Sequence, residues 1–146
     1  MPTRGYDTFP HDLYYDRATH TWVRNVGTVV TIGLDALGLE ALGDVAFLSL
    51  QAVGSAVKRA ETIGSLEAAK MVGELIAPVS GTIAARNEAV LRDPGLVNRE
   101  PYGAGWLVQI MPSGWELESA ELVHGADLPG WIEAEVKRYR SQGWID

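Results

Sequence analysis

The sequence predicts one mainly β domain, a sandwich or flattened barrel with one short internal helix and a C-terminal helix. Its 146 residues suit a single compact domain. Hydrophobic residues make up 47% and charged residues 21%, which is usual for a globular chain with one core. A series of short β-prone runs, separated by turn sequences, then favours an all-β sandwich or barrel as the body of the domain.

The predicted strands begin at Thr21 and are short. Glycines and prolines punctuate them, because glycine permits a positive φ and proline presets a bend. Examples are Val53-Gly54-Ser55 and Pro78-Val79-Ser80-Gly81. The expected strands cover residues 21–24, 27–33, 45–50, 61–66, 74–77, 81–85 and 106–110.

Two segments have helical spacing instead. Residues 34–42 place leucines and alanine on one face, and Gly43 can end the helix in a left-handed conformation. Residues 128–140 follow Asp127 as a possible N-cap, with Pro129 in the first turn and basic residues near the end. We expect this C-terminal helix to dock on the sandwich through one stripe: Trp131, Ile132, Glu135, Val136 and Tyr139.

The chain is expected to divide into three parts. Residues 1–20 would form an N-terminal tail that packs on the body, residues 21–112 the β domain, and residues 113–146 a C-terminal segment with its helix. Residues 1–10 lack an apolar run like that of a signal peptide, and no run of about 18 apolar residues occurs. We therefore expect a soluble cytoplasmic protein.

Charge and cysteine usage exclude several functions. A net charge of −7, from 19 acidic and 12 basic residues, repels phosphate backbones and anionic lipids. Nucleic acid and membranes are therefore not expected as main partners. The chain has no cysteine, which excludes disulfides, thiolate metal sites and cysteine nucleophiles. Any sulfur chemistry must arrive on a cofactor.

No motif for independent catalysis is found. His11, His20 and His124 lie far apart without metal-site spacing, so they are interpreted as surface or packing residues. GxGxxG, P-loop and GxSxG sequences are missing, and we assign no catalytic residue. Trp22, Trp106 and Trp131 are expected in the core, and Trp115 and Trp144 have no assignment.

The most informative segment is a predicted hairpin around Lys70. One apolar arm ends near Leu66 and the other starts near Leu75, with small residues between them. Lysine is scarce, since Lys58 and Lys137 are the only others. A primary amine can form an amide with a carboxylic cofactor, which a guanidinium cannot readily do. Spacing alone leaves open that Lys70 is an ordinary solvated turn residue.

Longer motifs resemble a known carrier family. The tip Glu67-Ala68-Ala69-Lys70, followed by Glu74 and Ala77-Pro78-Val79-Ser80-Gly81, resembles the modified-lysine hairpin of the lipoyl/biotinyl carrier superfamily. Within that superfamily, Gly43-Asp44-Val45, Pro94-Gly95-Leu96-Val97-Asn98 and the PYG-x-GW segment at 101–106 resemble the H protein of the glycine cleavage system. The likeness spans residues 21–112 and implies a hybrid β-sandwich of the lipoyl/biotinyl type.

The resemblance also implies a function. Lys70 would carry lipoate in amide linkage as N6-lipoyllysine, and Glu67 and Glu74 would help a lipoyl-attaching enzyme recognise the tip. The protein would be a non-catalytic carrier serving glycine decarboxylase, aminomethyltransferase and dihydrolipoyl dehydrogenase. For the two glutamates, solvated hairpin charges are the alternative interpretation.

Departures from the family pattern leave other functions open. The tip reads Glu-Ala-Ala-Lys-Met, where H proteins usually have Glu-Ser-Val-Lys-Ala, and Thr21 stands where an acidic residue is usual. Other stretches, such as Lys70-Met71-Val72-Gly73, resemble lipoate-binding relatives that serve a sulfur-oxidising heterodisulfide-reductase-like complex. A biotin carrier and an unmodified interaction module are further alternatives.

Overall fold

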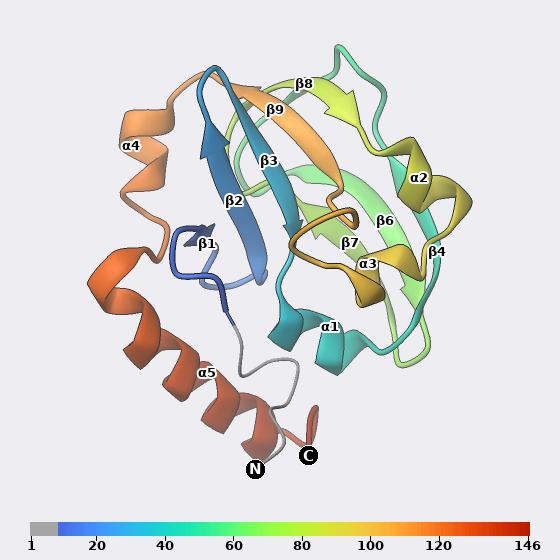
Figure 1. Cartoon of the computed structure of the whole chain (residues 1–146), viewed down its shortest axis with the longest axis vertical. Coiled ribbons are helices and arrows are strands. Elements are labelled where there is room, and N and C mark those ends of the chain that lie inside the picture. The colour runs from blue at the N-terminus through green and yellow to red at the C-terminus, as the bar shows by residue number, and fades with distance from the viewer. Residues whose placement is uncertain (1–8) are drawn as a thin grey trace.

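The computed structural model describes residues 9–146, so residues 1–8 of the expected tail lie outside it. Two antiparallel sheets pack against each other (Figure 1). The larger has the strand order β1-β2-β3-β9-β8-β5 and the smaller β4-β6-β7. The fold is therefore the predicted sandwich, and the two sheets do not close into a barrel.

The strands of the larger sheet are β1 (Tyr14–Tyr15), β2 (Thr21–Val26), β3 (Val29–Leu34), β5 (Ala56–Val57), β8 (Gly81–Arg86) and β9 (Val108–Pro112). Those of the smaller sheet are β4 (Val45–Leu50), β6 (Thr62–Ala68) and β7 (Val72–Ile76). The helices are α1 (Ala36–Leu42), α2 (Glu88–Arg92), α3 (Leu96–Arg99), α4 (Trp115–Ser119), the 3-10 turn η2 (Gly125–Asp127) and α5 (Leu128–Ser141).

Both predicted helices are present as α1 and α5. Gly43 follows α1 with the positive φ that was expected, +80°, but its ψ of −163° lies outside the left-handed helical region. Pro129 lies in the first turn of α5 as predicted. Asp127 occupies the N-cap position, but its side chain makes no capping hydrogen bond, so its predicted capping role is wrong. Trp106 precedes β9 in a loop, so its placement in a strand was also wrong.

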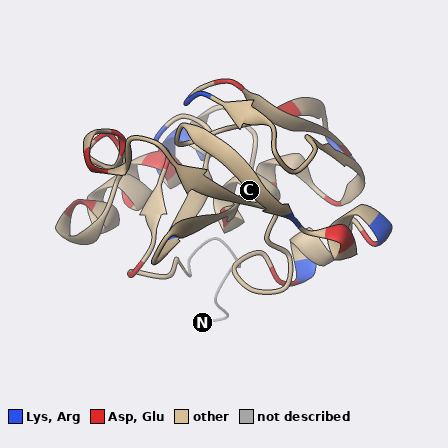
Figure 2. Ribbon diagram, turned by 90° about the horizontal axis from the view of Figure 1, so that it is seen from above, with Lys and Arg blue, Asp and Glu red and all other residues tan. Residues whose placement is uncertain are grey.

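The main core lies between the two sheets. Its buried side chains include Val30 and Ile32 of β3, Leu66 of β6, Leu75 of β7 and Ile110 of β9. In the smaller sheet, buried Leu66 and Leu75 alternate with exposed Glu67 and Glu74, the pattern of a half-buried antiparallel sheet. In the larger sheet, β2 and β3 are buried on both faces over much of their length. Figure 2 shows charged residues mostly on helices and loops, while the sheets are largely uncharged.

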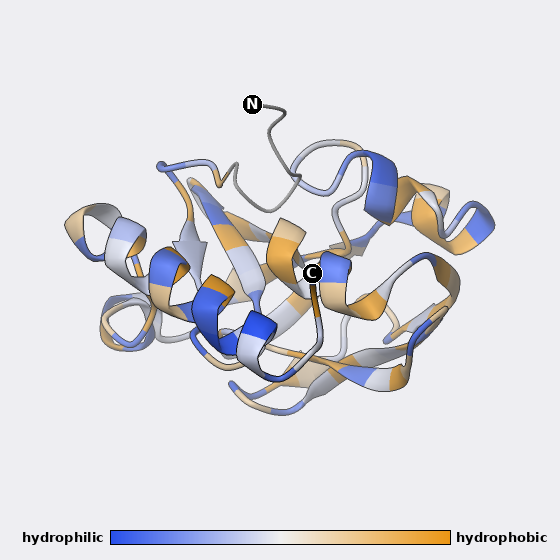
Figure 3. Ribbon diagram, turned by 90° about the horizontal axis from the view of Figure 1, so that it is seen from below, coloured by the Kyte–Doolittle hydropathy of each residue, from blue (hydrophilic) through white to orange (hydrophobic). Residues whose placement is uncertain are grey.

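A second apolar cluster joins α5 to the outer part of the larger sheet. Trp22 and Tyr15 are fully buried in it, together with Leu37 of α1 and Leu128 of α5. Residues 142–146 return toward α1 from the end of α5 (Figure 1), and Ile145 enters the same cluster. The view from below shows hydrophilic and hydrophobic residues alternating along α5 (Figure 3). The helix is thus docked through a stripe, as predicted.

No helix within residues 9–146 is long and apolar enough to cross a membrane.

Candidate functional site

Lys70 lies at the tip of the β6–β7 hairpin and is exposed. The Ala68 N–H donates to the Met71 carbonyl at 2.9 Å and closes the turn. Met71 and Val72 beside it are 51% and 71% exposed, which leaves apolar surface next to the amine. The structure therefore presents one long amine on a tight hairpin, as the sequence predicted.

The tip is fastened to the turn between α1 and β4. The Lys70 N–H donates to the Leu42 carbonyl at 3.0 Å, and the Ala69 N–H donates to the Asp44 carbonyl at 2.9 Å. Gly43 lies between these two acceptors, and a Cβ there would approach the Lys70 Cγ to 3.3 Å as well as require a strained positive φ. The backbone under Lys70 is thus fixed from two sides.

Asn98, from the Leu-Val-Asn motif, braces that turn. Its Nδ2 donates to the Gly43 carbonyl at 3.0 Å, and its Oδ1 accepts from the Val45 N–H at 2.8 Å. Tyr102, from the PYG motif, accepts a hydrogen bond from the Ala36 N–H at 2.8 Å and satisfies a free donor at the start of α1. Both motifs therefore support the elements beneath the hairpin tip.

The Lys70 ammonium group contacts α1 directly. Its Nζ donates to the Glu40 carbonyl at 3.0 Å, in the last turn of the helix. The last carbonyls of a helix lack partners within the helix, and a lysine there also complements the helix dipole. This contact holds the side chain along the molecular surface.

Glu67 and Glu74 lie on the outward face of the hairpin, and both are exposed. Glu67 pairs with Val72 across the strands, and Glu74 pairs with Ser65, so the two carboxylates are diagonal neighbours on one face. Leu66 and Leu75 occupy the opposite, buried face. The three predicted site residues are therefore close in the fold. Within residues 9–146, neither carboxylate forms an ion pair with the Lys70 amine, which bonds to the Glu40 carbonyl instead.

A cleft of about 620 Å³ opens beside Lys70. Its volume lies within the range of roughly 300–1,000 Å³ typical of small-molecule sites. One side is formed by α1 and the hairpin, and the other by Tyr139 and residues 143–146. The sequence did not reveal this cleft, because its two sides come from segments far apart in the chain, residues 34–75 and residues 139–146.

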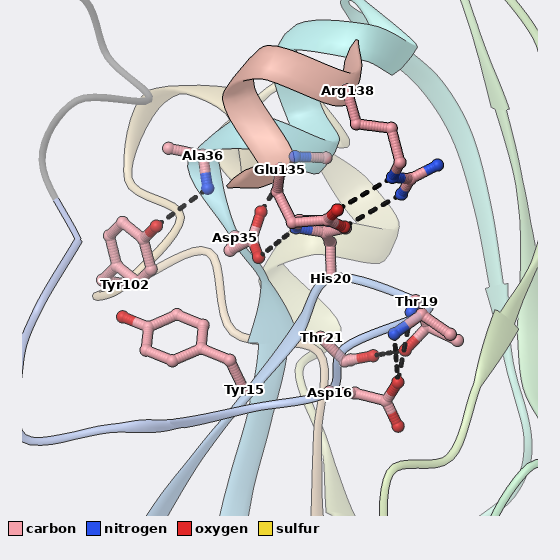
Figure 4. A network of polar contacts seen from close by, with 12 residues as sticks. Tyr15, Asp16, Thr19, His20, Thr21, Asp35, Ala36, Tyr102, Glu135 and Arg138 are labelled. Carbon is pink, nitrogen blue, oxygen red and sulfur yellow. Dashed lines mark hydrogen bonds and ion pairs between the residues drawn. The ribbon is translucent and has the colours of Figure 1, made fainter. Parts of the chain in front are cut away.

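A buried ionic network fixes α5 on the body of the domain (Figure 4). His20 is 1% exposed; its Nδ1 lies 2.7 Å from Asp35 Oδ2 and its Nε2 lies 2.8 Å from Glu135 Oε1. Arg138 donates two hydrogen bonds to the Glu135 carboxylate, at 2.8 and 2.9 Å. Trp131 stacks on the imidazole with ring centroids 5.0 Å apart.

The two carboxylates favour a doubly protonated His20, because each ring nitrogen then donates to one of them. Burial acts to lower the pKa of His20, but the hydrogen bonds and charges of Asp35 and Glu135 outweigh it and raise that pKa. Complete burial raises the pKa of Asp35, partly offset by the His20 contact. The Arg138 hydrogen bonds lower the pKa of Glu135.

The interpretation of His20 as an isolated histidine was incomplete. Because Thr21 pairs with Leu34 in the β2–β3 hairpin, His20 and Asp35 flank the same end of it, and the hairpin register could have indicated this contact. Glu135 comes from α5 and gave no such signal. The carboxylates lie on opposite ring nitrogens and do not converge on a common point, and no group suited to a metal ion is found in residues 9–146.

Comparison with known proteins agrees with these features. The family model for the glycine cleavage H-protein matches residues 13–135. The glycine cleavage system H protein of Gloeothece citriformis is 45% identical over 128 residues, covering 88% of this chain and 97% of the relative. The Myxococcus xanthus protein of the same description is 42% identical over 107 residues, covering 73% and 82%.

A solved structure shares the fold. The crystal structure of a glycine cleavage system H protein from Mycobacterium marinum superposes with a TM-score of 0.72 and 32% identity, covering 87% of this chain and 98% of that one. The match with the family model spans both sheets, the hairpin tip and most of α5. By sequence and by fold, this chain belongs to the glycine cleavage H-protein family.

Proposed function

We propose that Lys70 carries lipoate in amide linkage and that the protein is the mobile-arm carrier of a glycine cleavage system. The observation that supports this most directly is an exposed lysine at the hairpin tip of a chain that belongs to the H-protein family. An attaching enzyme would supply an activated lipoyl carboxyl. The Lys70 nitrogen would bond to its carboxyl carbon and lose a proton as the activating group leaves.

The residues around Lys70 fit an acylated lysine. Acylation removes the ammonium charge but leaves one amide N–H, which can keep the hydrogen bond to the Glu40 carbonyl. The cleft beside the lysine offers apolar contact from Leu42 and Met71 to a hydrocarbon chain. When bound, lipoate supplies a reducible disulfide that can receive a group or electrons at one enzyme and give it up at another.

Recognition of the tip is assigned to Glu67 and Glu74. Both carboxylates are exposed on one face of the hairpin, close to the exposed side chain of Val72. An attaching enzyme with basic groups around an apolar contact would complement this face. The hairpin backbone, fastened at Leu42 and Asp44, would hold the lysine in place during modification.

The proposed role is that of a carrier without catalysis of its own. Its partners would be glycine decarboxylase, aminomethyltransferase and dihydrolipoyl dehydrogenase, besides the lipoyl-attaching enzyme, and we place it in the cytoplasm. The relatives reported above are described as glycine cleavage proteins, so the sulfur-oxidising alternative is not favoured.

Lipoylation is tested by mass spectrometry. The chain is incubated with a lipoyl-attaching enzyme, and its intact mass and peptides are measured. We expect one lipoyl group on Lys70 and none on Lys58 or Lys137. The Lys70→Arg variant should stay unmodified, and modification that persists in it would overturn the assignment.

The pathway is tested by glycine–bicarbonate exchange with a glycine decarboxylase from the same organism. The lipoylated protein should support exchange, and Lys70→Arg should not, because transfer needs the arm delivered in register with the decarboxylase. A folded, fully lipoylated sample without exchange would contradict the glycine cleavage function.

A further inference from the structure

The side of the cleft opposite Lys70 comes from a segment outside the family match. The family model ends at residue 135, whereas Tyr139 and residues 143–146 line the cleft. This side is therefore built from sequence that the family pattern does not describe. Because Lys70 lines the same cleft, these residues lie within reach of a group attached to the lysine.

Residues 142–146, which we call the C-terminal hook, are held in a defined conformation. Gly143 turns the chain with φ of +76°, and the Trp144 N–H donates to the Tyr139 carbonyl at 3.0 Å. Ile145 is buried in the second core cluster. The hook is thus fixed on both sides of Trp144.

The Trp144 ring is supported on one side and open on the other. It meets Tyr139 edge to face, with ring centroids 5.1 Å apart, and the Arg138 guanidinium lies 5.6 Å from its centroid. The indole is nevertheless 46% exposed, and it lines the cleft that Lys70 also lines. A large aromatic side chain fixed in this way offers apolar contact at small entropic cost.

We propose that Trp144 is a positioning residue for the lipoyl arm, forming the surface against which the arm rests when it folds from Lys70 into the cleft. The inference rests on the proposed lipoylation of Lys70. The occupant is an apolar chain ending in two sulfur atoms, a dithiolane when oxidised and a dithiol when reduced, and in both states soft sulfur makes favourable contacts with aromatic rings. Resting there shields the sulfur atoms from solvent between encounters with enzymes.

The experiment uses the absence of cysteine from the chain, which makes the reduced lipoyl group the sole source of thiols. Lipoylated protein is reduced with a phosphine, the phosphine is removed because it reacts with maleimides, and the rate of alkylation by N-ethylmaleimide is followed by mass spectrometry. Trp144→Ala should react roughly three- to tenfold faster than the wild type, the factor expected when contact with one aromatic ring is lost. Trp144→Phe should restore most of the protection.

Leu117→Ala is the matched control. Leu117 is 83% exposed in α4 and does not line the cleft, so its loss should leave the alkylation rate unchanged. Thermal unfolding of each variant tests whether the hook region stays folded. Equal alkylation rates for wild type and Trp144→Ala, with both fully lipoylated, would overturn the role of Trp144 and leave the proposed function unaffected. Failure of Lys70 to gain the lipoyl mass would instead overturn the proposed function and the inference with it.

Discussion

Replacing Asp35 by Asn tests whether the buried charge of this residue stabilises the fold. One carboxylate performs two tasks, since Oδ1 accepts from the Gly38 N–H at 2.8 Å and Oδ2 contacts His20 at 2.7 Å. Asparagine is a good N-cap, so Asp35→Asn keeps the cap on α1. The substitution therefore removes mainly the charge that faces His20.

Burial penalises the Asp35 charge and raises its pKa, so the expected loss comes from leaving buried His20 without its charged partner at Nδ1. Hydrogen bonds to charged groups contribute about 1.5–3 kcal/mol, so Asp35→Asn should lower the free energy of unfolding by that amount. For a chain of this size, about 2–4 °C of Tm corresponds to each kcal/mol, which gives a drop of about 3–12 °C. Asp35→Ala should cost more, because breaking a buried ion pair costs about 3–5 kcal/mol and the lost cap adds about 1 kcal/mol.

The same network predicts a pH dependence. The pKa of His20 is raised in the folded protein, so its stabilisation is complete below the unfolded value of 6.5 and is lost as pH rises through the folded pKa. Burial also raises the pKa of Tyr139, to about 12, so this neighbour stays neutral in that window. The pKa of Glu135 is lowered in the folded protein, so the stability that this carboxylate contributes is lost only as pH falls through its folded pKa. In the Asp35→Asn variant, the free energy of unfolding should fall less steeply above pH 6.5 than in the wild type.

Urea unfolding, followed by tryptophan fluorescence from pH 6 to 9, measures both effects. Asp127→Asn is the control, since Asp127 lies at the N-cap of α5 without a side-chain capping bond and should change stability by less than about 0.5 kcal/mol. A wild type whose stability does not change over this range, or an Asp35→Asn variant as stable as the wild type, would refute the reasoning about the buried charge.

Two further substitutions test the hairpin and its sheet. Glu67→Ala should slow lipoylation while leaving Tm nearly unchanged, because exposed charges contribute less than about 1 kcal/mol; normal modification with a large loss of stability would make Glu67 a structural residue. Gly64→Ala should destabilise by at least about 1–3 kcal/mol in a thermal unfolding assay, because its Cβ would lie 2.0 Å from the Ser49 carbonyl oxygen. Gly73→Ala, with no atom within 4 Å of the added Cβ, is its control, and equal Tm values for the two variants would contradict this close approach.

Local signals explain which elements could be predicted. The long strands and α5 have clear hydrophobic periodicity and flanking glycines or prolines, so the sandwich and the hairpin at Lys70 followed from the sequence. The strand β5 has two residues, and α2, α3 and α4 have four or five, too few to establish a period. These elements form because neighbouring segments fix them, as Asn87 does by capping α2.

The site divides in the same way. Lys70, Glu67 and Glu74 lie within one hairpin, so they could be chosen as candidate residues from the family resemblance of that single segment. Their contacts depend on distant segments: Asn98 braces the turn below Lys70, and the C-terminal hook closes the far side of the cleft. No local pattern encodes which residues a docked helix or a returning tail will meet.

The helix α1 links the buried network to the hairpin tip that carries Lys70. It has seven residues, and isolated helices this short are unstable in water. Asp35 caps its start while binding His20, and the Glu40 carbonyl in its last turn accepts from Lys70. The interaction that holds α5, and with it the C-terminal hook, therefore also orders the support under Lys70. Both sides of the cleft are thus connected through one buried carboxylate, because Asp35 caps α1 through Oδ1 and, through Oδ2, contacts the His20 that binds Glu135 of α5.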